Sequence, residues 1–338
     1  MSDTPHDHIH PGDETGQPEH ANPIARYPDD MNESGVATHV IAHISDTHLL
    51  GGNRKLFSAI DVNRNLDRIL ERLRAGDQAI DAMVFTGDLA DIAEPEAYRW
   101  IRSRVEPVAE ELGAELVWVM GNHDERAPYA RELFDDETDG PQDRVYNANG
   151  LRIIALDTTV PGYHHGAITD EQLRWLTAEL GTPAKNGTVL AMHHPPLEAH
   201  NPFVRLIGLD ERDRLAAAIS GTDVRTILAG HLHYSTFGQF AGVPVGVASA
   251  TCYTVDMGAD KAFLLSAVDG AQSINLVHLY EHDIVHSIVP VDEYEQIAGY
   301  PASLRAVAEA MSVAEIREMV SNKNSEFNTA ERNQSADL

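Results

Sequence analysis

The chain has 338 residues, 43% of them hydrophobic, and a formal net charge of −28; it is long enough for a packed core and its charge argues against sequence-independent binding of nucleic acid. It has no apolar run of about 18 residues and no signal-type apolar stretch at its start, so we expect a cytoplasmic protein without a transmembrane segment. The single cysteine, Cys252, excludes an internal disulfide and follows an apolar run, which favours a buried structural thiol.

The first 37 residues are rich in Pro, Asp, Glu, Asn and His and contain almost no periodic apolar residues. Such a segment cannot offset the entropy lost on ordering, so we predict a disordered, acidic, histidine-rich tail over residues 1–37. Its histidines are His6, His8, His10 and His20. They could bind metal loosely, but we favour a solvated tail because no other ligands lie beside them at fixed geometry.

The first apolar run, Val40–Leu49 (VIAHISDTHL), breaks into Asp46 and His48. In a strand, residues two apart lie on the same face, so a carboxylate and an imidazole at this spacing can converge on one point. The pattern is typical of a pair of metal ligands. His43 alternates away from their face, and we expect it to be packed in the sheet.

Four later apolar runs repeat this design and end in side chains that can bind metal. They lead into TGD at Asp88, GNHD at residues 121–124, HHPP at residues 193–196 and GHLH at residues 230–233. In open α/β sheets, ligands bind outside the carboxyl ends of the strands. We therefore expect five strand ends to point at one site.

Helical patterns occupy the intervals between these runs. Apolar residues recur at helical spacing up to Gly76, and again from Pro95 up to Gly113. Thr169 and Gln172 have the spacing of a capping box at the start of a third helix.

Beyond Gly230, short apolar runs separated by turns indicate antiparallel strands that complete a second sheet. The chain as a whole predicts a layered α/β sandwich over residues 38–298. A helical segment is expected over residues 299–322 and a disordered tail over residues 323–338.

The candidate metal ligands at the strand ends are Asp46, His48, Asp88, Asn122, His193, His231 and His233. They are too many for one tetrahedral zinc ion but suit two ions that share a bridging ligand. Asp88 is the natural bridge, because a carboxylate carries charge and has two oxygens. Oxygen and nitrogen ligands without thiolate favour iron, manganese, zinc or magnesium, and the imidazoles count against a purely magnesium site.

The five motifs, in this order, resemble those of the calcineurin-like metallophosphoesterases: Asp-X-His, Gly-Asp, Gly-Asn-His-Asp/Glu, His and Gly-His-X-His. The longer sequence segments around these motifs are most similar to those of the class III cyclic-nucleotide phosphodiesterases of actinobacterial, mycobacterial type. They are SDTHL, TGDLAD, GNHDER, HHPP and AGHLHYS. The resemblance covers residues 38–290. It implies an α/β fold, a four-layer α-β-β-α sandwich of two mixed sheets flanked by helices.

The resemblance also implies how the ligands divide between two metal ions per chain, iron with manganese or zinc. One ion would take Asp46, His48, Asp88 and His233, and the other would take Asp88, Asn122, His193 and His231. Of the adjacent histidines, His193 would be the ligand, while His194 would turn inward or orient its neighbour.

Two cations a few ångströms apart lower the pKa of a bridging water, so that hydroxide can attack phosphorus in line. Asn122 would add a hydrogen bond to the phosphoryl group. We expect His123 to be the general acid, oriented by Asp124 as a carboxylate fixes a histidine tautomer. The alternative for His123 is a purely supporting role. The resemblance implies that His164 approaches the substrate phosphate, although a loop histidine is more often only part of the surface.

Two further acidic residues follow apolar runs. Asp91 is expected to orient the Asp88 loop or a ligand histidine, and Asp157 is expected to make structural hydrogen bonds.

These observations predict a phosphodiesterase that hydrolyses 3′,5′-cyclic nucleotides, cAMP above all, to 5′-monophosphates. Its partner would be this small-molecule phosphodiester, without stable binding of nucleic acid, and the related enzymes suggest a homodimer. The alternative is the same chemistry on 2′,3′-cyclic nucleotides, glycerophosphodiesters or other phosphoesters. A non-catalytic metal-binding scaffold would be favoured by missing ligands, and none is missing.

Overall fold

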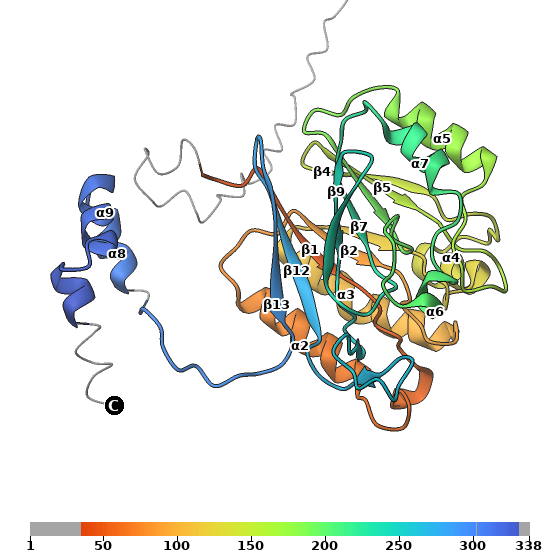
Figure 1. The fold of residues 1–338 in the computed structure, drawn as a ribbon, viewed down its shortest axis with the longest axis horizontal. Coiled ribbons are helices and arrows are strands. Elements are labelled where there is room, and N and C mark those ends of the chain that lie inside the picture. The colour runs from red at the N-terminus through yellow and green to blue at the C-terminus, as the bar shows by residue number, and fades with distance from the viewer. Residues whose placement is uncertain (1–34, 302, 331–338) are drawn as a thin grey trace, which may run out of the picture.

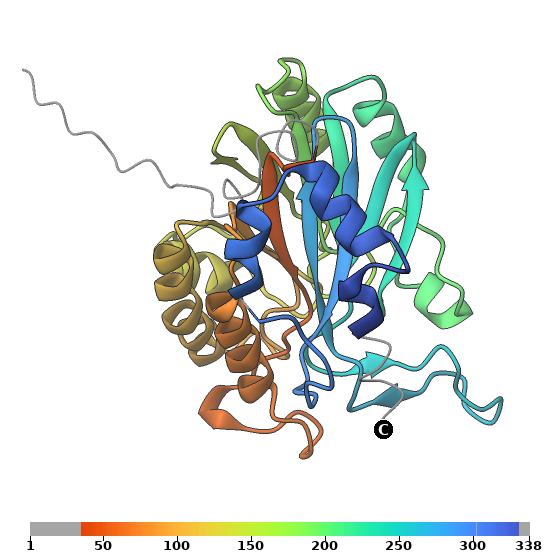
Figure 2. The ribbon, with the colours of Figure 1, turned by 90° about the vertical axis from the view of Figure 1, so that its left-hand side faces the viewer.

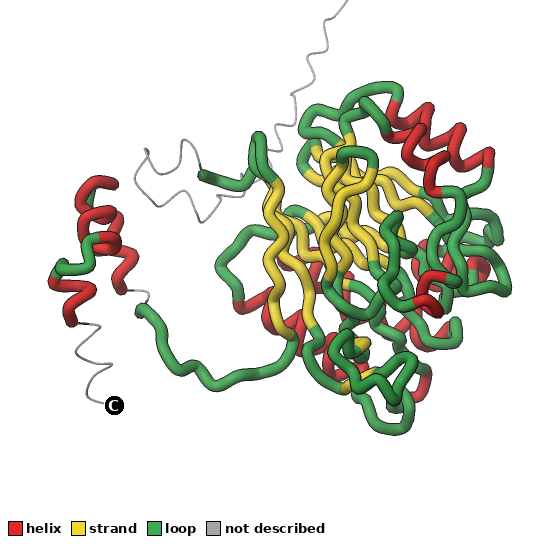
Figure 3. Tube along the Cα trace, in the orientation of Figure 1, coloured by secondary structure: helices red, strands yellow, loops and turns green. Residues whose placement is uncertain are grey.

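Two β-sheets lie face to face, and helices cover the outer face of each (Figures 1 and 3). The computed structural model describes residues 35–301 and 303–330. Residues 1–34 and 331–338, which make up most of the first tail predicted to be disordered and half of the second, lie outside the described residues. The described part of the second tail contains a helical run over residues 326–330.

The first sheet has five strands in the order β13-β12-β1-β2-β3. Its strands are β1 (His39–Ile44), β2 (Ala82–Thr86), β3 (Glu115–Val119), β12 (Ser273–Leu279) and β13 (Ile284–Pro290). The first three are parallel neighbours, and β12 runs antiparallel to β1. The sequence pattern assigned the late strands to a second sheet, but β12 and β13 extend the first one. Alternation alone does not specify which edge a strand joins.

The second sheet has six strands in the order β4-β5-β6-β7-β9-β8. They are β4 (Arg144–Ala148), β5 (Leu151–Leu156), β6 (Thr188–Met192), β7 (Val224–Ala229), β8 (Thr236–Phe240) and β9 (Val243–Val247). The four inner strands are parallel, and β4 and β8 are antiparallel edges. A short ribbon of β10 (Thr254–Val255) and β11 (Ala267–Val268) follows it in the chain.

Three apolar cores hold the layers together. The first lies between the first sheet and the helices α2 (Val62–Ala75), α3 (Pro95–Leu112) and α4 (Arg126–Phe134). The second lies between the other sheet and α5 (Asp170–Leu180), α6 (Pro202–Arg205) and α7 (Arg212–Ile219). The third, which includes Ile41, Val84 and Val189, fills the space between the sheets. The predicted four-layer α/β sandwich is confirmed.

The helix ends follow the signals in the sequence. Thr169 and Gln172 form the expected reciprocal capping box at the start of α5. Pro95 occupies the first turn of α3, where its missing N–H costs nothing. Gly113 ends α3 in the left-handed conformation at φ 67°, which favours glycine.

The C-terminal helices α8 (Ser303–Glu309) and α9 (Val313–Ser321) lie to the side of the first sheet (Figure 2). Neither contains a buried residue, and Arg305 forms an ion pair of 2.7 Å with Asp77. Among the described residues, no helix combines the length and the apolar character needed to cross a membrane.

Candidate active site

The loops that follow β1, β2, β3, β6 and β7 bring the predicted metal ligands together. Six of these side chains are buried, and Asn122 is partly buried. The buried ligands are Asp46, His48, Asp88, His193, His231 and His233. Side chains with formal charge are seldom buried unless they are paired or bind a metal, so this cluster has a function beyond packing.

Asp46 and His48 converge for a different reason from the one the sequence suggested. The strand β1 ends at Ile44, and both residues lie beyond it with positive φ angles of 52° and 44°. His231 and His233 likewise follow the end of β7 with φ angles of 71° and 58°. The alternation of a strand therefore does not orient these two pairs of side chains toward the site. They are oriented by left-handed backbone conformations, which are costly for residues other than glycine and concentrate at functional sites.

Two glycines of the motifs allow the loops to approach each other closely. A Cβ atom on Gly121 would lie 2.1 Å from the backbone nitrogen of Asp88, and one on Gly230 would lie 1.9 Å from Ser45 Oγ. Any other residue at Gly121 would push the loops after β2 and β3 apart, and any other residue at Gly230 would push the loops after β1 and β7 apart.

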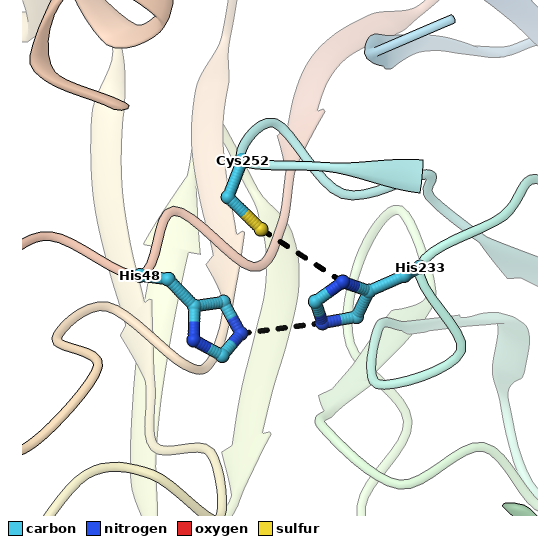
Figure 4. Close-up of side chains that lie close together, drawn as sticks. All are labelled: His48, His233 and Cys252. Atoms are coloured by element: carbon cyan, nitrogen blue, oxygen red, sulfur yellow. Dashed lines mark hydrogen bonds between the residues drawn. The ribbon is translucent and has the colours of Figure 1, made fainter. Parts of the chain in front are cut away.

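One cluster contains Asp46, His48, Asp88 and His233, whose ligand atoms all lie within 4.8 Å of one another. The Nε2 atoms of His48 and His233 are 3.2 Å apart (Figure 4). Asp46 Oδ1 lies 3.3 Å from His233 Nε2, and Asp88 Oδ2 lies 3.4 Å from His48 Nε2.

The second cluster shares Asp88 with the first. Asp88 Oδ2 lies 3.3 Å from His193 Nε2, and that nitrogen lies 3.0 Å from Asn122 Oδ1. The rings of His193 and His231 have their centroids 5.1 Å apart. The other carboxylate oxygen, Asp88 Oδ1, accepts the backbone N–H of His123 at 2.8 Å. One oxygen of Asp88 is therefore held by the backbone, and the other lies between the two clusters, in the place expected of a bridging ligand.

The hydrogen bonds made by His48 and His193 decide which nitrogen of each ring has a lone pair available to a metal ion. His48 donates from Nδ1 to Asp91, and His193 donates from Nδ1 to the backbone oxygen of Thr86 at 2.7 Å. In the neutral tautomer, each Nε2 then carries a lone pair directed at the cluster. Among the residues that the structure describes, His231 Nε2 is buried and has no hydrogen-bond partner. Carboxylate oxygens and imidazole lone pairs gathered at one point fit metal cations, and the second hydrogen bond on His48 and on His193 is the arrangement found in metal sites.

The electrostatics point the same way. Burial lowers the pKa of His48, but the hydrogen bonds with Asp88 and Asp91 outweigh burial and raise that pKa to about 10. Burial also lowers the pKa of His193, but the negative charge of Asp88 outweighs burial and raises that pKa to about 9. Burial alone would raise the pKa of Asp46, but the charge of His233 outweighs burial and lowers that pKa to about 2. The carboxylates thus create a field that attracts positive charge, whether protons or metal ions.

Asp91 and Asp124 hold different groups in place: Asp91 binds histidine rings, and Asp124 binds backbone amides. His123 donates from Nδ1 to the backbone oxygen of Asp91 at 2.8 Å, and the Asp91 carboxylate receives His48. The sequence predicts that Asp124 orients His123, but His123 Nδ1 donates to Asp91 instead. The Asp124 carboxylate instead accepts backbone N–H groups of Leu89, Ala90 and Gly121 and the hydroxyl of Tyr98, so it fixes the metal-ligand loops.

His164 and His194 connect the loop after β5 to the ligands. Asn122 donates from Nδ2 to His164 Nδ1 at 2.9 Å, which places His164 beside the second cluster. His194 accepts the hydroxyl of Thr158 at Nδ1 (2.8 Å) and donates from Nε2 to the backbone oxygen of His164 (3.0 Å). Both nitrogens of His194 are thereby occupied, so it holds the loop in place, as a residue turned inward would.

Three other sequence expectations can be compared with the structure. Cys252 is buried, and its Sγ lies 3.8 Å from Nδ1 of His233, while His48 faces Nε2 of the same ring (Figure 4). Burial raises the pKa of this thiol, in agreement with a structural role. His43 is fully buried and makes a 2.9 Å hydrogen bond with Thr86, as expected of a residue packed in the sheet. Asp157 binds Arg126 and backbone groups, again as expected.

A cavity of about 440 Å³ opens beside the clusters and is lined by His123, Asn122 and His164 on the side of the ligands. Ile92, Glu125 and Tyr163 line it elsewhere. The sequence analysis gave Ile92 and Glu125 no role. Glu125 lies within the segment GNHDER and Ile92 lies one residue after Asp91, but only the folded loops show that both line this cavity.

Comparisons with known proteins agree with this geometry. The chain matches the calcineurin-like phosphoesterase family over residues 39–235. It is 52% identical over 263 residues to a cAMP/cGMP dual specificity phosphodiesterase of Mycobacterium tuberculosis, covering 78% of this chain and 82% of that one. A probable cyclic nucleotide phosphodiesterase of Rhodococcus erythropolis is 46% identical over 286 residues, covering 84% and 94%.

A glycerophosphodiester phosphodiesterase of Enterobacter lignolyticus is 31% identical over 222 residues, covering 64% of this chain and 78% of that one. The extent of these matches, the order of the motifs and the paired clusters of buried ligands lead to one conclusion. This chain belongs to the calcineurin-like phosphoesterase family.

Proposed function

We propose that this protein is a metal-dependent phosphodiesterase that hydrolyses 3′,5′-cyclic nucleotides, cAMP and cGMP, to the 5′-monophosphates. The observation that carries the proposal is the convergence of two buried ligand clusters on a shared Asp88. The substrate class is supported by 52% identity to a relative described as a cAMP/cGMP dual specificity phosphodiesterase.

The metal ligands are proposed residue by residue. Asp46, His48, Asp88 and His233 would hold one ion, and Asp88, Asn122, His193 and His231 would hold the other. When bound, the two ions supply an activated water and positive charge for the phosphoryl oxygens. The mixture of carboxylate, amide and imidazole donors supports iron with manganese or zinc as the pair.

His123 is the proposed general acid. Its Nδ1–H is engaged by the backbone oxygen of Asp91, which leaves Nε2 to hold the proton that the departing alkoxide needs. The ring lies beside the ligands, with its centroid 4.6 Å from that of His48. Asp91 thus orients two histidines at once, one proposed as a metal ligand and the other as the acid.

Asn122 and His164 are the proposed phosphate-binding pair. The Nδ2–H of Asn122 is given to His164 Nδ1, so neutral His164 carries its proton on Nε2 and can donate it to a phosphoryl oxygen. His194 donates to the backbone oxygen of His164 at 3.0 Å, which supports a fixed position for this ring.

Glycerophosphodiesters are a second candidate substrate class, because one relative of 31% identity is described as a glycerophosphodiester phosphodiesterase. Hydrolysis of 3′,5′-cAMP, 3′,5′-cGMP, 2′,3′-cAMP and glycerophosphocholine by the metal-loaded enzyme separates the two. The proposal expects the largest kcat/KM on the 3′,5′-cyclic nucleotides. A larger value on glycerophosphocholine would overturn it in favour of the second class.

Two wider predictions accompany this function. The free thiol of Cys252 supports a reducing, cytoplasmic location. A homodimer remains our expectation for the assembled enzyme, and sedimentation of the full chain would test it.

A further inference from the structure

Cys252 lies against one of the proposed metal ligands without being a ligand itself. Its sulfur is 3.8 Å from Nδ1 of His233, whose other nitrogen, Nε2, is 3.2 Å from Nε2 of His48 (Figure 4). All three side chains are buried, and each has a ligand atom within 4.8 Å of those of the other two. A side chain in this place can orient a metal ligand without touching the metal.

The imidazoles of the site differ in what holds the Nδ1 atom. His48 donates from Nδ1 to the carboxylate of Asp91 at 2.9 Å, and His193 donates from Nδ1 to a backbone oxygen at 2.7 Å. At Nδ1 of His233, the partner is the sulfur of Cys252. The thiol therefore has the place at His233 that an oxygen acceptor has at the other two rings.

The direction of the hydrogen bonds around the sulfur decides which nitrogen of His233 is protonated. The S–H group of Cys252 donates to the backbone oxygen of Tyr253 at 4.0 Å. A thiol has one hydrogen, so a sulfur that donates to this oxygen meets Nδ1 of His233 as an acceptor. Nδ1 then carries the hydrogen, and the neutral ring presents the lone pair of Nε2 to the cluster. A metal ligand that binds through Nε2 needs this tautomer.

Backbone contacts hold Cys252 in place beside the ligands. Its N–H donates to the backbone oxygen of Asp46 at 3.2 Å, which ties it to a loop that carries another ligand. The buried side chain of Gln272 donates to the carbonyl oxygen of Cys252 at 3.1 Å, and buried Asn65 donates to that of Thr251 at 3.0 Å. Buried polar groups are costly to leave without partners, so these contacts fix the position of the sulfur.

We propose that Cys252 is a positioning residue, whose sulfur accepts the Nδ1–H of His233 and holds Nε2 of that ring toward a metal ion. The inference rests on the proposed function, in which His233 binds a metal ion. It gives the thiol a role in metal binding in addition to packing. Loss of an outer partner of a metal ligand lowers metal affinity by about 10- to 100-fold, and a neutral sulfur belongs at the lower end of that range.

Two substitutions separate orientation from packing. Cys252→Ala removes the acceptor. Cys252→Asn keeps one, because its amide oxygen can accept from His233 and its N–H₂ group can donate to the backbone oxygen of Tyr253. Competition with increasing chelator on the full-length, zinc-loaded proteins measures how tightly each ion is held. Cys252→Ala is expected to hold one ion about tenfold more weakly and the other as the wild type does, while Cys252→Asn is expected to stay within about threefold of the wild type for both.

Further variants control for packing. Cys252→Val fills the space without an acceptor and is expected to lose affinity for one ion as Cys252→Ala does. Ile274→Val is the matched control, because Ile274 is buried in the same apolar core and loses one methylene, and it is expected to hold both ions as the wild type does. Wild-type affinity for both ions in Cys252→Ala or Cys252→Val would overturn the proposal. Equal losses in Cys252→Ala and Cys252→Asn, or a loss in Ile274→Val, would also overturn it.

The same preparations separate this proposal from the proposed function. A wild type that hydrolyses cyclic nucleotides, with a Cys252→Ala variant that holds both ions normally, would refute the positioning role and leave the activity. Selective loss of one ion in Cys252→Ala, together with a wild type that hydrolyses neither cAMP nor cGMP, would refute the activity and leave the positioning role.

Discussion

Asn122 Oδ1 and His193 Nε2 lie 3.0 Å apart, although in neutral His193 neither atom has a hydrogen to donate to the other. The His193 Nδ1–H is already given to the backbone oxygen of Thr86. Two lone pairs at this distance repel unless a proton or a metal ion lies between or beside them. In the first cluster, the Nε2 atoms of His48 and His233 lie 3.2 Å apart while the Nδ1–H of His48 is given to Asp91, so this half of the site also gathers nitrogen ligands at one point.

Replacement of His123 tests its role as general acid. His123→Ala should lower kcat for 3′,5′-cAMP by about 10²- to 10⁴-fold, because the departing ribose alkoxide needs a proton. The loss should be much smaller for bis(p-nitrophenyl) phosphate, whose leaving group is stable without one. Steady-state kinetics on both substrates measure the ratio. Equal losses would show that His123 only supports the ligands.

His194 can be tested with two amides that each imitate one ring nitrogen. His194→Gln retains a donor near the position of Nε2 and can still bind the His164 backbone oxygen, whereas His194→Asn can reach only toward Thr158. Loss of one hydrogen bond of about 1 kcal/mol should raise KM about fivefold in His194→Asn and less than twofold in His194→Gln. Metal content serves as the control. Identical kinetics of the two variants would contradict a positioning role.

Asp124 should matter for stability. Burial, followed by the nearby charge of Asp88, raises the pKa of Asp124 to about 6, while four donors surround its oxygens. In Asp124→Asn the amide N–H₂ would face backbone N–H groups, at a cost of about 2–4 kcal/mol in the free energy of unfolding. Tyr98→Phe, which removes one donor, should cost about 1 kcal/mol. Unchanged stability with lost activity would instead favour a catalytic Asp124.

His286 should make the fold sensitive to acid. Burial lowers its pKa to about 4, so the unfolded chain binds a proton between about pH 6.5 and pH 4 that the folded chain does not. The contribution of His286 to stability is therefore present above pH 6.5 and is lost as the pH falls, by up to about 1.4 kcal/mol per pH unit.

Urea unfolding of metal-free protein between pH 7 and pH 4.5 measures this slope. His286→Asn should make the slope shallower, while His282→Gln, at a solvent-exposed histidine in the preceding turn, should leave it unchanged. An identical slope in wild type and His286→Asn would contradict the account.

The sequence was most informative where one physical rule dominates. Apolar runs between Val40 and Ala229 are long enough to be buried strands, and the loops that follow the carboxyl ends of β1, β2 and β3 in one sheet and of β6 and β7 in the other meet at one site. The capping box at Thr169 and the glycine after α3 are local signals that need no tertiary context.

The sequence was less informative where the outcome depends on contacts between distant loops. Asp46 and His48 are aimed by left-handed turns that the alternation of a strand does not predict. Asp91 and Asp124 both lie within the motif segments TGDLAD and GNHDER, and only the packed structure shows that Asp91 binds the histidines while Asp124 binds backbone amides. The cavity wall at Tyr163 depends on two loops that meet only in the fold.

The most direct test of the central claim is hydrolysis of 3′,5′-cAMP by wild type and Asp88→Ala, with the metal content of both proteins measured on the same samples. Since Asp88 Oδ2 lies between the two clusters, the account predicts that the variant retains less metal than the wild type and loses at least about 10³-fold in kcat, the scale of a removed charge-stabilising group. A variant that keeps wild-type turnover would contradict the shared-carboxylate site.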